Sequence, residues 1–203
     1  MGNFLLFENL ILMSIHRSKS IYRALILLLC LISAPVYAQL NIEIFGGGAS
    51  RIPIAIVPFA DENKLQQSIT PVISADLQRT GLFKLVDPAG LSPHAPVEVV
   101  YADWANRGAN ALVIGRVVPI SGDQVEIQFR LMDVAKKSQL TGLAITVPTA
   151  QLRMAAHRIA DVIYEALTGD VGVFSTRIAY VLKRGNKYAL QVADADGYNA
   201  QSI

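Results

Sequence analysis

The sequence predicts an α/β domain of the α+β-like kind, in which two helices pack on a mixed sheet and a short separate β element follows. Residues 52–59 (IPIAIVPF) form a near-continuous apolar run, which is typical of a central strand buried on both faces. Strand patterns at 111–119, 124–133 and 139–147 have short polar connections that predict an antiparallel meander. A helical pattern at 150–167 supplies an apolar stripe that can cover this sheet.

The first 38 residues predict a secretory signal peptide. Basic residues precede an unbroken apolar run at 24–32, and small residues before Gln39 predict cleavage between Ala38 and Gln39. The run is much shorter than the roughly 20 apolar residues that a membrane-spanning helix needs. A start at Met13 would give a signal of ordinary length, with Met1 an upstream mis-start. We therefore expect export to the periplasm without direct membrane insertion.

Charge and cysteine content agree with a soluble exported chain. Removal of residues 1–38 takes away three of the 18 basic residues and one of the 16 acidic ones, so the mature chain is formally neutral. No net charge then favours nucleic acid or anionic lipid as a partner. The only cysteine, Cys30, also leaves, and Leu29 before it is larger than a lipidation site tolerates.

The mature N-terminus predicts a short strand on a flexible tether. Its apolar and polar residues alternate, and three glycines follow, Gly46, Gly47 and Gly48. The strand either frays or pairs with its own sheet, or it adds to the sheet edge of a partner through main-chain hydrogen bonds. The candidate partner-binding residues are Gln39, Leu40, Asn41, Ile42, Glu43, Ile44 and Phe45.

A first helix is predicted after the central strand. Thr70 fits an N-cap and Pro71 a first helical position, with Gly81 as the terminator. Asp76 on this helix is interpreted as a solvated flanking residue. Residues 82–86 predict a second strand, which a following Asp-Pro pair ends.

The next segment offers one histidine and the only tryptophan. The loop at 91–96 is rich in proline, and its His94 is interpreted as a surface residue because no carboxylate or thiol lies near it at catalytic spacing. Residues 101–108 predict one or two turns of helix that end at glycine, with Trp104 as a core or lid aromatic.

The helix at 150–167 is the predicted centre of the domain. Its apolar stripe consists of Leu152, Ala156, Ile159, Ile163 and Leu167. His157 beside the stripe is interpreted as a flanking polar residue, because Asp161 alone makes a weak case for a metal site. Gly169 ends the helix.

Two further strands, at 176–182 and 187–194, surround a short polar turn. The following Asp-Ala-Asp-Gly-Tyr-Asn at 194–199 partly resembles a calcium loop, but its glycine stands at the wrong offset and no bidentate glutamate follows. A turn is the better interpretation. Two strands by themselves are marginally stable in water.

Five stretches together resemble the TolB family of the periplasmic Tol-Pal system. They are residues 54–59 (IAIVPF), 108–117 (GANALVIGRV), 164–169 (YEALTG), 176–181 (TRIAYV) and 194–199 (DADGYN). The resemblance covers essentially all of residues 39–203. It implies an α/β N-terminal domain followed by a six-bladed β-propeller.

The resemblance also divides the chain and suggests its partners. Residues 1–38 are then the signal peptide, 39–50 the strand and glycine tether, 51–170 the N-terminal domain and 171–203 the start of an incomplete β-propeller blade. It implies that the N-terminal segment binds TolA, and that the propeller binds the lipoprotein Pal and supports outer-membrane integrity and envelope constriction in cell division. We expect a fragment or a broken gene product that lacks most of the Pal-binding surface.

The sequence leaves two other functions open. Propellers of this type also precede hydrolase domains, but residues 39–203 contain no Gly-x-Ser-x-Gly elbow, HExxH pair or P-loop. A curli-secretion-type outer-membrane assembly lipoprotein would require lipidation at Cys30. The sequence favours a non-enzymatic adaptor with no cofactor, and it predicts no catalytic or metal-ligating residue.

Overall fold

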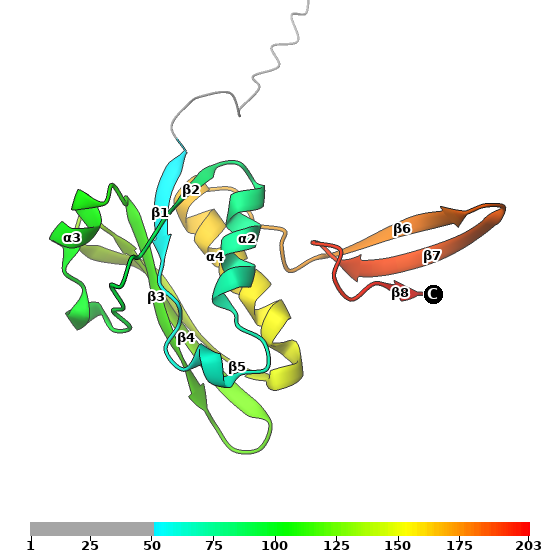
Figure 1. Cartoon of the computed structure of the whole chain (residues 1–203), viewed down its shortest axis with the longest axis horizontal. Helices are drawn as coiled ribbons and strands as arrows, with labels where there is room; N and C mark the ends of the chain where they lie inside the picture. Colours follow the sequence, from blue (N-terminus) through cyan, green and yellow to red (C-terminus); the bar gives the residue numbers. More distant parts are fainter. Residues whose placement is uncertain (1–50) are drawn as a thin grey trace, which may run out of the picture. The chain divides into compact units, whose positions relative to one another are not determined.

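The computed structural model describes residues 51–203, which form a five-stranded mixed sheet and a three-stranded antiparallel sheet (Figure 1). The strands are β1 (Ile52–Ile56), β2 (Phe83–Val86), β3 (Ala111–Pro119), β4 (Gln124–Asp133), β5 (Ser138–Pro148), β6 (Arg177–Arg184), β7 (Lys187–Asp194) and β8 (Gln201–Ser202). The helices are α2 (Thr70–Arg79), α3 (Tyr101–Asn106) and α4 (Leu152–Thr168). Short 3-10 turns lie at η1 (Glu62–Lys64), η2 (Pro96–Glu98) and η3 (Thr149–Gln151). The predicted fold class is confirmed.

Strand β1 lies between β2 and β3 in the first sheet, whose order is β2-β1-β3-β4-β5. It pairs in parallel with β2 on one side and with β3 on the other, so that Ile54 lies opposite both Leu85 and Ala111. Ile54 and Ala55 point to opposite faces of the sheet, and neither is accessible to solvent. Burial on both faces explains why this segment is apolar almost throughout.

The predicted meander is formed by β3, β4 and β5, which pair antiparallel in sequence order. Helices α2 and α4 pack on one face of the sheet and against each other (Figure 1). The α4 stripe is buried there at Leu152, Ala156, Ile159 and Ile163. Burial of a large apolar side chain stabilises a fold by roughly 1.5–3 kcal/mol, so α4 is a main contributor to the core.

A smaller core lies under α3. It is formed by Trp104 together with Ala55, Val57, Val99, Ala109, Leu112, Ile114, Met132 and Val134. Trp104 is therefore a core residue, as one of its two interpretations predicted. Because β1 and β3 contribute to both cores, their two faces hold the two layers of the domain together.

The start of α2 differs from the prediction. The N-cap is Ile69, and Thr70 is the first helical residue. The side chain of Ile69 is a hydrocarbon and cannot accept a hydrogen bond. The carboxylate of Glu62 accepts hydrogen bonds from the backbone N–H groups of Ile69 (3.1 Å) and Thr70 (2.9 Å). The Thr70 hydroxyl instead accepts one from the N–H of Phe59 (3.1 Å). A distant residue thus caps the helix.

The second sheet has the order β6-β7-β8. Strands β6 and β7 form the predicted hairpin, in register from Arg177 opposite Asp194 to Arg184 opposite Lys187. The short strand β8 pairs with β7 and was not predicted. Most side chains of β6 are exposed, which distinguishes this sheet from the buried strands of the first.

Replacement of Glu62 by alanine tests the remote cap. It leaves the two N–H groups at the start of α2 without their buried acceptor, so we expect the free energy of unfolding to fall by about 1–3 kcal/mol. Urea denaturation followed by circular dichroism measures this loss. Glu165→Ala, at an exposed position of α4, is the control. Equal stability of the two variants would contradict the role of Glu62.

Candidate functional site

The partner-binding residues that the sequence predicts, 39–45, lie outside the residues that the structure describes, as do the hinge at 46–48 and the cleavage site at Ala38. These predictions therefore stay predictions. Within residues 51–203, no helix is both long and apolar enough to cross a membrane. Within the described residues, a polar cluster on α4 is the candidate site.

Three polar residues of α4, Arg153, His157 and Asp161, recur every fourth position and therefore lie along one side of the helix. We call them the α4 polar stripe. Each of the three approaches the segment 172–198, which includes β6 and β7: Arg153 and His157 near Asp196, and Asp161 at the chain before β6. The stripe therefore connects α4 to the second sheet.

His157 is completely buried, so its interpretation as a flanking residue was wrong. Its Nδ1 lies 2.5 Å from a carboxylate oxygen of Asp76, which is also buried and not a solvated flank. Packing of α2 against α4 brings the two together from positions far apart in sequence. An aspartate carboxylate accepts hydrogen bonds, so the proton of this contact belongs to Nδ1. The other carboxylate oxygen of Asp76 accepts a hydrogen bond from Arg79 (2.8 Å).

The predicted turn at 194–199 is confirmed and faces the stripe. The N–H of Gly197 donates to the carbonyl of Asp194 (2.8 Å), and the N–H of Tyr198 donates to the Asp196 side chain (3.0 Å). The second carboxylate oxygen of Asp196 forms an ion pair with Arg153, whose guanidinium lies 4.1 Å from the centre of the Tyr198 ring. The same oxygen is 3.7 Å from Nε2 of His157.

The electrostatic surroundings of Asp196 favour its charged form. Partial burial raises the pKa of this carboxyl, but the hydrogen bond from Tyr198 and the ion pair with Arg153 outweigh that effect. The pKa is therefore lowered from the ordinary value of 3.8. Asp196 stays a carboxylate at neutral pH, which suits it to bind a cation or a guanidinium.

Asp161 holds the chain that enters β6. Its carboxylate accepts hydrogen bonds from the backbone N–H groups of Phe174 (2.6 Å) and Ser175 (3.0 Å), and a third from the Ser175 hydroxyl. Gly172 permits this approach, because a Cβ atom at that position would lie 2.5 Å from the Cα atom of Asp161. Any larger residue at 172 must push the segment away from α4.

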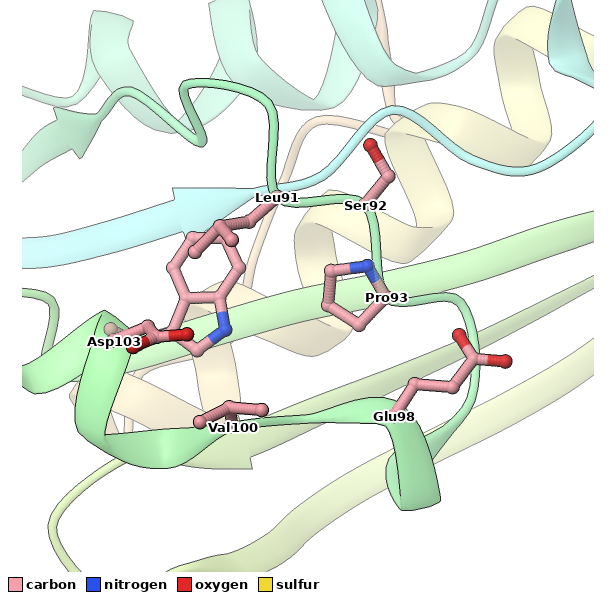
Figure 2. Close-up of a pocket in the computed structure, with 7 residues that line it drawn as sticks. Leu91, Ser92, Pro93, Glu98, Val100 and Asp103 are labelled. Carbon is pink, nitrogen blue, oxygen red and sulfur yellow. The ribbon is translucent and has the colours of Figure 1, made fainter.

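Apart from the α4 polar stripe, the described residues form a pocket beside the loop that precedes α3. It is a pocket of about 250 Å³ lined by Leu91, Ser92, Pro93, Glu98, Val100, Asp103 and Trp104. Figure 2 shows Leu91, Ser92 and Pro93 along the loop on one side, and Val100 and Asp103 on the other, where α3 begins.

Glu98 at the rim of this pocket has a local structural role. Its carboxylate accepts hydrogen bonds from the N–H groups of His94 (2.7 Å) and Ala95 (3.2 Å), and these lower its pKa from the ordinary value of 4.5. Glu98 is therefore charged at neutral pH. A general acid must carry a proton at that pH, so Glu98 is not suited to that role. His94 is half-buried and lies in this turn, so it is less exposed than the predicted surface histidine.

The sequence contained one signal for the α4 polar stripe. The spacing of Arg153, His157 and Asp161 places charged and polar groups beside the apolar stripe for two full turns. A solvated helix face and a buried polar contact give the same sequence pattern there. The partners Asp76 and Asp196 are 81 and 39 positions away from His157. No local pattern could assign them.

Comparison with known proteins gives a consistent result. A family model described as the TolB amino-terminal domain matches residues 40–140. The Tol-Pal system protein TolB of Nitrosospira multiformis is 66% identical over 183 residues, which are 90% of this chain and 42% of that protein. The corresponding protein of Nitrosomonas europaea is 56% identical over 178 residues, with 88% and 42% covered.

A solved structure agrees with these relatives. The crystal structure of TolB from Acinetobacter baumannii is similar with a TM-score of 0.67 and 34% sequence identity, over 79% of this chain and 40% of that one. The chain thus spans about two fifths of the length of the relatives that it matches.

Two substitutions test the contact between α4 and the chain before β6. Asp161→Ala removes the acceptor of the Phe174 and Ser175 N–H groups. Because these are hydrogen bonds to a charged group, we expect the free energy of unfolding to fall by about 1.5–3 kcal/mol. Gly172→Ala should speed amide hydrogen exchange at the same two positions, because its Cβ atom meets Asp161. Val171→Ala, at a neighbouring exposed residue, is the control. Unchanged exchange in both variants would contradict the contact.

The turn at Glu98 predicts an acid-dependent change beside the pocket. Since the folded state lowers the pKa of Glu98, the contribution of this turn to stability is complete above pH 4.5 and is lost as the pH falls through the lowered value. We expect the NMR amide shifts of His94 and Ala95 to titrate with a midpoint below 4.5. Glu98→Gln should abolish this titration. A midpoint above the ordinary value would contradict the assignment.

Proposed function

Because this chain belongs, through residues 40–140, to the TolB amino-terminal domain family, we propose that it is a non-enzymatic adaptor of the Tol-Pal system in the periplasm. It binds TolA with residues 39–45. In a longer protein that also contains a full propeller, the propeller binds Pal, and the pair of contacts supports outer-membrane integrity and envelope constriction during division.

The structural observation that supports an adaptor function is the α4 polar stripe. Arg153 and Asp161 use their charges to hold the segment 172–198 on the helix, and His157 is buried between Asp76 and Asp196. Side chains of this kind act as a scaffold between two structural elements. A protein that joins two partners needs such a connection between the parts that bind them.

The N-terminal domain also has a favourable position for its tail. The tether at 46–48 ends four residues before β1, the central parallel strand with a buried core on each face. We propose that residues 40–45 add as a strand to a sheet edge of TolA, with the glycines as the hinge.

Residues 171–203 are, in this proposal, the start of the first propeller blade. The three-stranded antiparallel sheet β6-β7-β8 is compatible with a blade, and its exposed apolar side chains, such as Val181, Tyr188 and Leu190, would be covered by further strands. No Pal-contacting residue is assigned in the present chain. The hydrolase and curli-type alternatives receive no support from the relatives.

Deletion of residues 39–48 tests TolA binding. The affinity of the mature chain for the periplasmic domain of TolA, measured by isothermal titration calorimetry, should fall at least tenfold, because the main-chain donors and acceptors of the added strand are gone. Within the tail, Glu43→Pro removes one N–H group while Glu43→Ala keeps it, so only the proline variant should weaken a strand-addition complex. Unchanged affinity of the deletion variant would refute the proposal.

A further inference from the structure

We propose that His157, Asp194 and Asp196 form a binding site for a divalent transition-metal ion of the zinc class, with Asp76 as the outer carboxylate that orients the histidine. One ligand atom from each of the three residues lies within 4.8 Å of the other two. The site joins α4 to the turn that follows β7.

The strongest observation is the unused nitrogen of His157. Its side chain is completely buried, and among the residues that the structure describes, Nε2 has no hydrogen-bond partner. Nδ1 faces Asp76, and Nε2 on the other side of the ring lies 3.7 Å from an oxygen of Asp196. A lone pair that faces a carboxylate is repulsive unless a cation or a proton lies between them.

The contact between Asp76 and His157 has the form that accompanies bound metals. A histidine that ligates a metal almost always donates its other N–H to a carboxylate or carbonyl, which fixes the tautomer and the ring orientation. Here that donor contact is 2.5 Å long and buried. The ring therefore needs no rearrangement to bind an ion through Nε2.

The distances suit a tetrahedral ion after a small movement of the turn. Zinc binds histidine nitrogen and carboxylate oxygen at about 2.0–2.2 Å, which places neighbouring ligand atoms roughly 3.3–3.5 Å apart. The 3.7 Å between His157 and Asp196 is close to this value. The widest pair of ligand atoms lies within 4.8 Å and must contract by up to about 1.5 Å. Asp194 is the last residue of β7, whereas Asp196 lies in the turn that follows, so the side chain of Asp196 is the one that can make that adjustment.

The donor set distinguishes zinc from calcium and magnesium. Those hard ions prefer six or more oxygen ligands, whereas one imidazole and two carboxylates with an open position suit Zn²⁺ and its neighbours in the transition series. The Asp194–Asn199 sequence by itself lacks the spacing of a calcium loop. The tertiary structure supplies the missing ligand from α4.

Arg153 is the natural competitor for the ion. Its guanidinium pairs with the Asp196 oxygen that also faces His157, and Arg177 lies 3.9 Å from an oxygen of Asp194. An arriving ion must displace Arg153 from Asp196, while the stacking of its guanidinium on Tyr198 keeps it nearby. Removal of this arginine should therefore strengthen metal binding, which a purely structural ion-pair network would not do.

The experiment uses the full chain with Cys30→Ser, so that no thiol competes, after treatment with a chelator. Titration with ZnCl₂ by calorimetry should give one site, and Co²⁺ should give visible absorption bands of a tetrahedral complex. His157→Gln, Asp194→Asn and Asp196→Asn should each weaken binding at least tenfold. His94→Gln, the matched control outside the cluster, should leave it unchanged, and Arg153→Gln should raise the affinity.

Two results would overturn the proposal. One is the absence of stoichiometric Zn²⁺ or Co²⁺ binding by the parent chain. The other is binding that the two turn variants and His157→Gln all leave intact, which would assign the ion to surface groups. Circular dichroism of each variant establishes that it is folded, and Asp194→Asn and Asp196→Asn keep the proposal testable if His157→Gln destabilises the chain.

Discussion

Helix α4 carries an apolar stripe and a polar stripe side by side, and most of the rest of the described structure depends on where each of them is buried. The apolar stripe packs on the sheet and beside α2. The polar stripe cannot follow it, because a buried polar or charged group destabilises the fold unless a partner is supplied. Arg153, His157 and Asp161 obtain theirs from Asp76, the turn at Asp196 and the chain before β6.

This requirement decides where the second sheet attaches. Most side chains of β6 are exposed, and among the described residues after α4 only Phe174 belongs to the main apolar core. Apolar contacts alone would permit many orientations, since they have no preferred direction. Hydrogen bonds from Phe174 and Ser175 to one carboxylate have fixed directions and lengths. The attachment of the hairpin is therefore determined mainly by polar geometry.

The same principle operates at the start of α2. Glu62 is buried and binds two backbone N–H groups, while Thr70 binds a third that belongs to the segment after β1. The two contacts tie the loop between β1 and α2 to the helix. In both places a side-chain oxygen organises main chain from another segment, and removal of one partner leaves unsatisfied groups behind.

An adaptor benefits from connections of this kind. A directional polar contact keeps two elements in one relative orientation, and it can be strengthened or weakened by a change in charge at a single place. The cluster of His157, Asp194 and Asp196 is such a place, because an ion bound there would act on the contact between α4 and the turn.

Local sequence pattern determined the elements and the core. The bounds of β3 and β4 match the prediction, and the apolar stripe of α4 is buried as expected, because strand alternation and helical periodicity report directly on which side chains face the core. The same pattern could not identify the cap at Glu62 or the burial of His157 and Asp76. A polar residue beside an apolar stripe has the same sequence signature whether it faces water or a partner. Only the packing of α2 and the turn at Asp196 against α4 decided between the two, since the partners lie many residues away and meet through tertiary structure.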